Sequence, residues 1–348
     1  MRRALSLAHT GWGQTAPNPL VGAVIVRDGV VVGEGAHQRF GGPHAEVAAL
    51  AMAGTRARAA TLFVTLEPCN HHGKTPPCVD SLVAAGVARV VVAMRDPNPV
   101  ASGGADRLRA AGITVEFGLL EQAARDLNAP FAFAARGARR PWVTLKLALD
   151  ADGAMAPADR SQQWLTGAES RAWVHRLRAG SDAVAVGIGT VLADDPRLTV
   201  RDGDAPRVPP RRVVFDRRAR LPQTSMLART ATEIPVSVLA ARPDGPSRQA
   251  LAALGVDCVV ADGLSAQLGQ LHESHGTRAL FVEGGLTIAD ALWQANLVDR
   301  LIIFQASVRL GPDALRPFGG VRPYEASRIV AQRRLGPDLM TEYAIHDP

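Results

Sequence analysis

Short apolar runs alternate with helical patterns along most of the chain, and this alternation limits the fold more than any other feature. The runs GAVIVR (22–27), TLFVT (61–65) and RVVVAM (89–94) have the length of strands, and helix-like spacing of apolar residues lies between them. Strands that alternate with helices form a mostly parallel sheet covered by helices. The chain is therefore predicted to be of the α/β class.

The alternation is interrupted at the segment ARGARRP (135–141), which combines charge, Gly and Pro as linkers do. With 348 residues, the chain is also more than twice the usual domain size. We therefore predict two domains, residues 1–140 and 141–348, each with its own core. The Ala-rich stretch 119–135 before the linker is predicted to form one long helix.

Charge and composition argue against a polyanionic or membrane partner. The net charge of +6, from 39 Lys and Arg against 33 Asp and Glu, is small and scattered. No apolar stretch reaches the ~18 residues of a membrane span, and the N-terminus lacks the pattern of a signal peptide. Three cysteines are too few for a disulfide framework. These features predict a cytoplasmic protein, and they leave open whether it forms a homo-oligomer.

Lysine is almost absent from the chain. Only Lys74 and Lys146 are lysines, and the other 37 cationic residues are arginines. This bias suggests that these two positions require an ammonium group and not a guanidinium.

The first domain contains a pattern typical of a catalytic zinc site: His44 and Glu46 in HAE, Cys69 in EPC, and Cys78. One imidazole and two thiolates leave the fourth position of tetrahedral zinc open for water, whose pKa zinc lowers to ~7. Glu46 can carry a proton from that water to a leaving amine. The order agrees with that of zinc deaminases, although nine positions separate the cysteines instead of three. Taken singly, these residues could be a capping histidine and two buried cysteines.

The first domain resembles the deaminase half of the bifunctional deaminase–reductase family of riboflavin biosynthesis. The resemblance rests on TAPNPLVGAVIV (15–26), HAE (44–46) and TLEPCNHHGKTPPC (65–78). It implies a cytidine-deaminase-like three-layer α/β/α fold with the zinc ligands and proton shuttle named above. It also implies contacts with the pyrimidine and the phosphoribosyl group at Asn18, His37, His71 and Lys74. Taken by itself, Asn18 would be a turn residue between two prolines.

Two glycine turns of the second domain follow predicted strands, GIG at 187–189 and EGG at 283–285. Such turns let backbone N–H groups approach phosphate oxygens, and two of them in one domain suggest a dinucleotide. Neither is a full G-x-G-x-x-G, because Leu192 stands where the third glycine would be. A Rossmann domain is therefore not supported.

Two basic residues of this domain each allow two interpretations. Lys146 lies in an otherwise apolar strand (142–148), where an inward-facing lysine is costly unless it is paired. The alternative is an outward-facing residue at a sheet edge. Arg217, which follows the predicted strand 212–215, could hold a 2′-phosphate and favour NADP over NAD, or it could belong to a solvated basic turn.

The second domain resembles the reductase half of the same family, through PWVTLKLALDADG (141–153), QWLT (163–166), the run from HRLR to LTVR (175–201) and FVEGG (281–285). The resemblance implies a dihydrofolate-reductase-like α/β fold and the cofactor NADPH. The positions that match cofactor contacts are Ala148, Trp164, Thr190, Asp194, Arg217, Gly284 and Gly285. The positions that match substrate contacts are Lys146, Gln162, Arg178, Leu198, Arg201 and Glu283.

Two of the matched residues are supported by physical reasoning, since the guanidinium forks of Arg178 and Arg201 suit phosphate oxygens. Three residues depart from the family pattern. Asp150 and Gln162 stand where the family usually has Ser, and Arg217 stands where a small polar residue is common.

The combined resemblance implies a bifunctional enzyme of riboflavin biosynthesis, and its partners would be small phosphoribosyl pyrimidines. Zinc-dependent hydrolysis would deaminate 2,5-diamino-6-(5-phosphoribosylamino)pyrimidin-4-one, and NADPH would then reduce the ribosyl group of 5-amino-6-(5-phosphoribosylamino)uracil to ribityl. One rival interpretation is a nucleic-acid deaminase, which the aromatic content of 5% disfavours. The other is a zinc-stabilised binding module with an inactive reductase half, suggested by Asp150 and Gln162.

Overall fold

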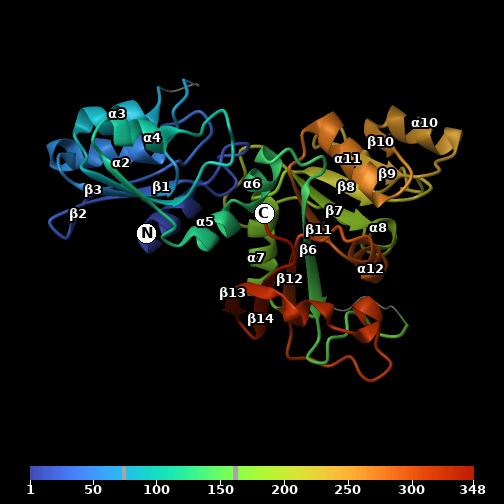
Figure 1. Cartoon of the computed structure of the whole chain (residues 1–348). Coiled ribbons are helices and arrows are strands. Elements are labelled where there is room, and N and C mark those ends of the chain that lie inside the picture. The colour runs from blue at the N-terminus through green and yellow to red at the C-terminus, as the bar shows by residue number, and fades with distance from the viewer. Residues whose placement is uncertain (73–75, 160–163) are drawn as a thin grey trace. The chain divides into compact units, whose positions relative to one another are not determined.

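The computed structural model describes residues 1–72, 76–159 and 164–348 (Figure 1). It divides into two compact units, Met1–Ala138 together with Pro348, and Arg139–Asp347. Two of the predicted site residues, Lys74 and Gln162, lie outside the described residues. Among the described helices, none combines the length and the apolar character that a membrane-spanning helix needs.

The first unit contains a five-stranded sheet in the order β2-β1-β3-β4-β5. Its strands are β1 (Gly22–Arg27), β2 (Val30–Ala36), β3 (Thr61–Leu66), β4 (Arg89–Met94) and β5 (Thr114–Phe117). Strand β1 is antiparallel to β2 and β3, whereas β3, β4 and β5 are parallel. The carboxyl ends of β3 and β4 therefore lie side by side.

Helices cover both faces of this sheet. They are α1 (Arg2–Ala8), α2 (Ala45–Ala53), α3 (Cys78–Ala85), α4 (Gly104–Ala110), α5 (Glu121–Leu127) and α6 (Ala129–Ala135). In Figure 1, α2, α3 and α4 lie on one side of the sheet and α5 on the other, which is the expected three-layer arrangement. Helix α2 packs very closely on β2, because a Cβ added at Gly35 would lie 2.2 Å from the carbonyl oxygen of Ala45. This close packing fixes the place where α2 begins.

The prediction of one helix over residues 119–135 is wrong, because two helices, α5 and α6, replace it. The break is at Asn128, whose side chain is used elsewhere. Its Oδ1 accepts a hydrogen bond from the N–H of Leu20 at 2.8 Å, and its Nδ2 donates to the Leu20 carbonyl at 2.9 Å. Pro130 suits the first turn of α6 but not a helix interior.

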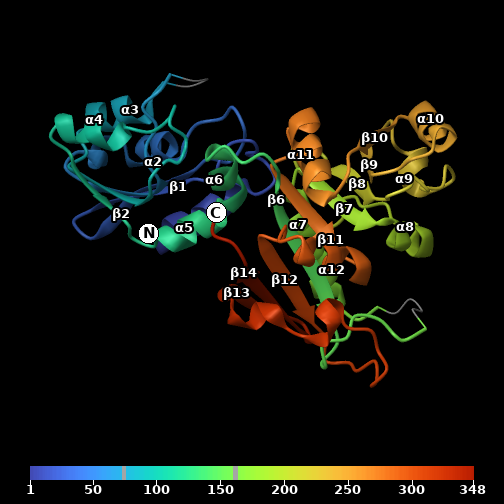
Figure 2. The same cartoon turned by 45° about the vertical axis from the view of Figure 1, so that its right-hand side comes forward.

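The second unit contains a nine-stranded sheet in the order β10-β9-β8-β7-β11-β6-β12-β14-β13. Its strands are β6 (Trp142–Leu149), β7 (Ala183–Gly187), β8 (Arg211–Phe215), β9 (Val236–Ala240), β10 (Val256–Val260), β11 (Ala279–Glu283), β12 (Arg300–Gln305), β13 (Arg328–Leu335) and β14 (Asp338–Ala344). The strands from β10 to β12 in this order are parallel, and β14 and β13 are antiparallel additions beside β12 (Figure 2).

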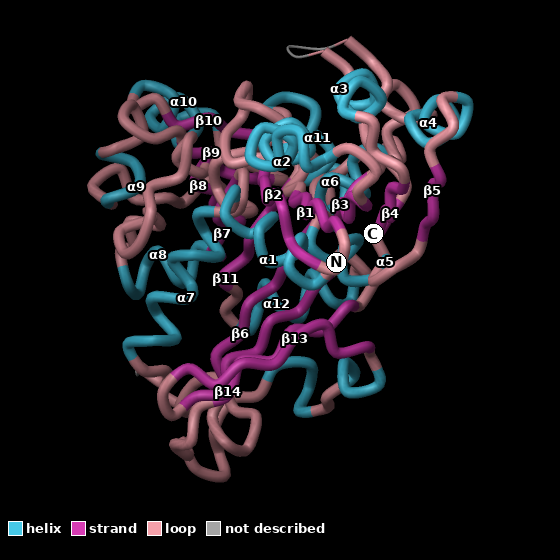
Figure 3. The backbone as a smooth tube through the Cα atoms, turned by 90° about the vertical axis from the view of Figure 1, so that its left-hand side faces the viewer, coloured by secondary structure: helices cyan, strands magenta, loops and turns pink. Residues whose placement is uncertain are grey.

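The helices of this unit are α7 (Ala168–Ala179), α8 (Ile188–Asp194), α9 (Met226–Arg229), α10 (Gly245–Ala253), α11 (Leu264–His275) and α12 (Leu286–Gln294). The sequence patterns did not predict α8, α9, α11, β13 or β14. Helices α8 and α9 are only 7 and 4 residues long. Strand β13 is an edge strand with mostly exposed residues, so an apolar alternation is weak there; Figure 3 shows it beside β14.

Neighbouring residues on the central strands pack on opposite faces of the sheet. On β7, Ala183 and Ala185 join one buried apolar cluster, while Val184 and Val186 join another. On β6, Leu145 and Leu147 join the first cluster, so Lys146 faces the second. Because β6 lies between β11 and β12, the interpretation of Lys146 as an edge residue is wrong.

Candidate functional site

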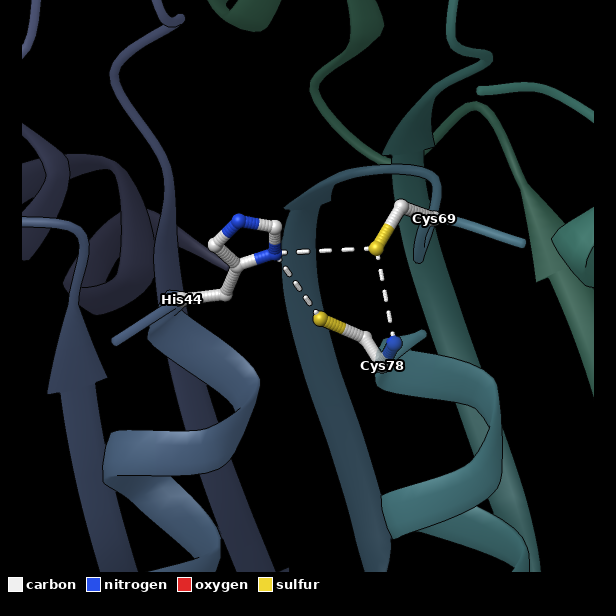
Figure 4. Close-up of side chains that lie close together, drawn as sticks. All are labelled: His44, Cys69 and Cys78. Carbon is white, nitrogen blue, oxygen red and sulfur yellow. Dashed lines mark hydrogen bonds between the residues drawn. The ribbon is translucent and has the colours of Figure 1, made fainter. Parts of the chain in front are cut away.

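Three metal-binding side chains meet in the first unit although they are far apart in the sequence (Figure 4). His44 precedes α2, Cys69 follows β3 and Cys78 is the first residue of α3. The Nδ1 atom of His44 lies 3.1 Å from Cys78 Sγ and 3.6 Å from Cys69 Sγ. All three donor atoms lie within 4.8 Å of one another. The structure thus brings together the three predicted ligands.

This donor set suits zinc. One imidazole and two thiolates are common zinc ligands, and bond lengths of about 2.0 Å to nitrogen and 2.3 Å to sulfur fit so compact a group. Hydrogen bonds from Cys78 and from His44 lower the pKa of Cys69 to about 4. The neighbouring Cys69 sulfur and burial raise the pKa of Cys78. A bound cation would offset the second negative charge that two thiolates require.

Glu46 lies in the first turn of α2, beside Cys78 and two residues beyond His44. Only 4% of this residue is exposed, and burial raises the pKa of its carboxyl group. Glu46 also lines the same cavity as His44 and Cys69. The side chain is therefore next to the metal-binding group and open to a bound molecule.

A cavity of about 340 Å³ opens beside the metal-binding group. Its polar lining includes Asn18, His37, His44, Glu46, Glu67, His71, Asp96 and Asn98. His37 is buried and its ring has two partners, the carbonyl oxygen of Pro43 at Nδ1 and the Asn18 amide nitrogen at Nε2, at 3.0 and 3.2 Å. Burial lowers the pKa of His37, so the neutral ring donates to Pro43 and accepts from Asn18. The Oδ1 atom of Asn18 can then face a ligand.

His71 lines the cavity with a ring nitrogen that the described residues do not satisfy. Its Nδ1 atom is buried and lacks a hydrogen-bond partner among the described residues. A buried polar atom of this kind is costly unless a ligand or water pairs with it. Of the four predicted substrate contacts in this unit, three therefore line the cavity, and the fourth, Lys74, is outside the described residues.

Glu67, Asp96 and Asn98 also line the cavity, although the sequence patterns did not predict them as site residues. Leu66 pairs with Met94 in the parallel strands β3 and β4, so residues just beyond these two strand ends become neighbours. Burial raises the pKa of Asp96 to about 6. One sequence signal could have identified Asp96 and Asn98: polar residues come directly after the strand 89–94, at the same sheet edge as the Cys69 segment.

In the second unit, three of the predicted substrate-side residues form one cluster. Lys146 and Glu283 are directly paired positions of β6 and β11. Arg178 reaches Glu283 from α7 through two hydrogen bonds, Nε to Oε1 at 2.5 Å and Nη2 to Oε2 at 2.9 Å. Although burial alone would raise it, the pKa of Glu283 is held low by Arg178 and Lys146. Burial lowers the pKa of Lys146.

The two glycine turns of this unit face each other. Helix α8 begins directly after β7, and α12 begins directly after Gly285. A Cβ added at Gly285 would lie 3.6 Å from Thr190 Oγ1, so the turn and the hydroxyl form a narrow cradle. Such a cradle beside two helix N-termini suits the phosphates of a dinucleotide.

Four other predicted residues of this unit come from different segments of the chain. Ala148 is a half-buried residue of β6, and Leu198 is buried with a positive φ of 53°. Asp194 is exposed at the end of α8. Trp164 is 73% exposed, and the Arg171 guanidinium lies over its ring. Ala148 thus lies on β6 and Asp194 at the end of α8, while Trp164 and Leu198 lie outside the helices and strands of this unit.

Arg217 lies in an exposed turn after β8, and its backbone carbonyl accepts hydrogen bonds from Ala241 and Arg242 beyond β9. Exposed arginines thus gather where two neighbouring parallel strands end. Within the described residues, the guanidinium groups of Arg217 and Arg242 have no ion-pair partner. The turn is open to a phosphate, as the cofactor interpretation requires.

Asp150, one of the departures from the family pattern, has a structural role. Its carboxylate is completely buried and accepts backbone hydrogen bonds from Asp152, Ala154 and Leu310 at 2.7–2.8 Å. These bonds hold the turn after β6 against a distant loop and lower the pKa of Asp150 against the effect of burial. Asp150 therefore stabilises the turn that follows β6.

Comparisons with known proteins agree with this geometry. A family described as the RibD C-terminal domain matches residues 141–341, and the zinc-binding region of cytidine and deoxycytidylate deaminases matches residues 1–94. The chain belongs to the RibD family. RibD proteins of riboflavin biosynthesis from Aquifex aeolicus and Escherichia coli are 40% and 45% identical to it. The alignments cover 98% and 90% of this chain and 96% and 88% of those relatives.

Solved RibD structures have the same fold. The Acinetobacter baumannii protein superposes with a TM-score of 0.81 at 39% identity. A deaminase/reductase from Thermotoga maritima superposes with a TM-score of 0.82 at 34% identity. Each comparison covers 99% of this chain and 97% of the other.

Membership of the RibD family confirms the predicted fold class and the prediction of a bifunctional riboflavin-biosynthesis enzyme. The first unit is a zinc-binding deaminase domain, and the second is a reductase domain of a family that uses a nicotinamide cofactor. This decides between an enzyme and the inactive binding module in favour of the enzyme.

Proposed function

We propose that the first unit deaminates 2,5-diamino-6-(5-phosphoribosylamino)pyrimidin-4-one and that the second reduces 5-amino-6-(5-phosphoribosylamino)uracil with NADPH. The Thermotoga maritima relative is named as a diaminohydroxyphosphoribosylaminopyrimidine deaminase and 5-amino-6-(5-phosphoribosylamino)uracil reductase. The observation that carries the proposal is the pairing of the His44, Cys69 and Cys78 group with Glu46 at one cavity.

In the deaminase reaction, His44, Cys69 and Cys78 would hold zinc. Bound zinc would supply a nucleophile at neutral pH, because it lowers the pKa of its water from 15.7 to about 7. Glu46 accepts the proton that the attacking water loses and delivers it to the amino nitrogen. The water oxygen replaces the amino group on carbon 2 of the pyrimidine, the C–N bond breaks, and ammonia leaves.

The cavity lining orients the pyrimidine. Asn18 is held by His37, so its Oδ1 atom can accept a hydrogen bond from a ring N–H or amino group. His71 offers its unsatisfied Nδ1 atom to the same ligand. Lys74 is proposed to bind the phosphoribosyl group, on the basis of the sequence match alone.

In the reductase reaction, Thr190, Gly284 and Gly285 would hold NADPH, which would supply the hydride needed to reduce C1′ of the opened sugar. The reduction also consumes one proton. Lys146 can donate it, because burial lowers the pKa of its ammonium group and so eases proton release. Glu283 lies opposite Lys146 and can bind the sugar hydroxyls as an ionised acceptor.

Purified chain should release ammonia from the diaminopyrimidine and then oxidise NADPH, and Lys146→Met should abolish only the second activity. We expect its rate of NADPH oxidation to fall about 100-fold or more, because a general acid is lost. Lys146→Arg should recover little, since a guanidinium does not release its proton. Ammonia release by both variants is the internal control. Normal NADPH oxidation by Lys146→Met would refute the assigned role.

Arg217→Ala should change the choice of cofactor. If Arg217 binds the 2′-phosphate, kcat/KM for NADPH should fall about 10- to 100-fold, the value of one charge-assisted hydrogen bond, while kcat/KM for NADH stays the same. Arg334→Ala is the matched control, because this exposed arginine lies on the edge strand β13, which six strands of the sheet separate from β9 and five from β8. An equal fall in kcat/KM for NADPH and for NADH would show that Arg217 does not bind the 2′-phosphate.

A further inference from the structure

Helix α7 holds the loop 198–202 of the reductase domain through three contacts. Arg178 Nη1 donates to the carbonyl oxygen of Thr199 at 2.8 Å. His175 Nδ1 lies 3.3 Å from the backbone nitrogen of Arg201, and His175 Nε2 lies 3.6 Å from Asp202 Oδ2. The loop begins at Leu198, whose positive φ of 53° is uncommon for a residue other than glycine. External contacts are therefore needed to hold this backbone.

The two arginines of this region differ in what their guanidinium groups can do. Arg178 is buried, and three of its N–H groups already bind Glu283 and Thr199. Arg201 is exposed, and its guanidinium has no ion-pair partner within the described residues. Arg201 is thus the one of the two whose planar fork is open to the phosphate of a substrate.

His175 determines where the Arg201 backbone lies. The imidazole is 6% exposed, and the amide N–H of Arg201 can only donate, so Nδ1 must accept and the ring proton must be on Nε2. That proton points to the Asp202 carboxylate. Both ring nitrogens are used, and both partners are in the loop that carries Arg201.

The charges around His175 are mixed. Arg178 comes from its own helix, Arg201 and Asp202 from the loop, and Glu283 from β11. Burial lowers the pKa of His175 below 6.5, and the charges of Arg178 and Arg201 lower it further, against the effect of the two carboxylates. The ring is therefore neutral at neutral pH, as the hydrogen bond from Arg201 requires.

We propose that His175 is a positioning residue of the reductase, whose neutral imidazole fixes the backbone of Arg201 so that its guanidinium faces the substrate phosphate. The inference rests on the proposed function, in which Arg201 binds that phosphate. His175 itself does not touch the substrate. Its loss should weaken recognition of the phosphate and leave hydride transfer to a bound substrate intact.

The test compares KM and kcat for 5-amino-6-(5-phosphoribosylamino)uracil and for its dephosphorylated form. His175→Leu removes the acceptor of the Arg201 N–H and the contact with Asp202, so KM for the phosphorylated substrate should rise about 10-fold while kcat changes less than about 3-fold. KM for the dephosphorylated form should not change. His175→Gln, which keeps a neutral acceptor and donor, should restore most of the affinity. His272→Leu is the matched control, because this histidine also bonds to a backbone group but lies on α11.

Arg201→Ala separates this inference from the proposed function. If Arg201→Ala leaves KM for the phosphorylated substrate unchanged, the phosphate role of Arg201 is wrong. If Arg201→Ala raises KM but His175→Leu does not, only the positioning role is wrong. The inference predicts that His175→Leu adds nothing to the KM of Arg201→Ala, because both act through one group. It is also wrong if His175→Leu raises KM equally for both substrates.

The pH dependence gives a second readout. As the pH falls through the lowered pKa of His175, protonation of the imidazole removes its acceptor and adds a cation beside Arg178 and Arg201. The ratio of wild-type KM to the KM of His175→Gln should therefore rise as the pH falls. Titration of the substrate phosphate cancels in this ratio, since it affects both proteins alike. A ratio that does not vary with pH would contradict the inference.

Discussion

Glu46→Gln will release ammonia from the diaminopyrimidine about 100 to 10,000 times more slowly than the wild-type protein, the usual contribution of a general acid–base group. The substitution keeps the size of the side chain and removes only its ability to carry a proton. Glu46 is buried beside Cys78 and faces the cavity, so its carboxyl group lies next to the metal-binding group where the proton must move. Ammonia release is measured together with bound zinc.

The variant should retain about one zinc per chain, because Glu46 is not among the three grouped donors. It should also oxidise NADPH at the wild-type rate when supplied with the deaminated substrate. Glu116→Gln is a suitable control, since that glutamate is exposed on β5 and pairs with Arg89. Undiminished ammonia release by Glu46→Gln would overturn the proposed proton shuttle.

Asp299→Ala will destabilise the second unit by about 3–5 kcal/mol, the usual cost of removing one partner from a buried ion pair. The Asp299 side chain is completely buried before β12 and binds Arg140 through both oxygens, at 2.6 and 2.8 Å. It also accepts hydrogen bonds from the N–H of Val143 and from His346. Without the carboxylate, Arg140 loses two hydrogen bonds and the buried N–H group of Val143 loses its acceptor.

Urea unfolding followed by tryptophan fluorescence will measure this effect, since four of the five tryptophans lie in the second unit. Asp347→Ala is the control: its ion pair with Arg328 is 82% exposed at the aspartate, and such pairs contribute less than about 1 kcal/mol. Equal destabilisation by the two variants would contradict the role of Asp299.

The same ion pair predicts a dependence on pH. Burial alone would raise the pKa of Asp299, but Arg140, His346 and the N–H of Val143 hold it below its usual value. The stabilisation is therefore complete above the unfolded pKa of about 3.9 and is lost as the pH falls through the lower folded pKa. The difference in unfolding free energy between wild type and Asp299→Ala should shrink in that acidic range.

The zinc ligands could be predicted because short local sequence motifs identify them. His44 and Glu46 begin a helix, Cys69 follows a strand and Cys78 begins the next helix, so each pattern places its side chain at the same edge of an α/β sheet. Asp96 and Asn98 have no such pattern. They join the cavity only because β4 pairs with β3, a contact between segments about 30 residues apart.

Asp150 has a role that no local pattern predicts. It stands out in the sequence only as a departure from the family pattern, and its three backbone hydrogen bonds show that it closes a turn. One of its partners, Leu310, is 160 positions away, beyond the reach of any local pattern. The helix predicted over 119–135 failed for the same reason, since its break at Asn128 depends on Leu20.

The sequence by itself determined the α/β class, the family and the identity of the zinc-binding residues, because periodicity and short motifs are local properties. Only the tertiary structure decided which residues share a face or a partner. Lys146 lies on a central strand opposite Glu283, and Arg178 forms hydrogen bonds with that glutamate, whereas Arg201 is exposed. These outcomes depend on strand order and on long-range hydrogen bonds, which form only when distant segments pack together.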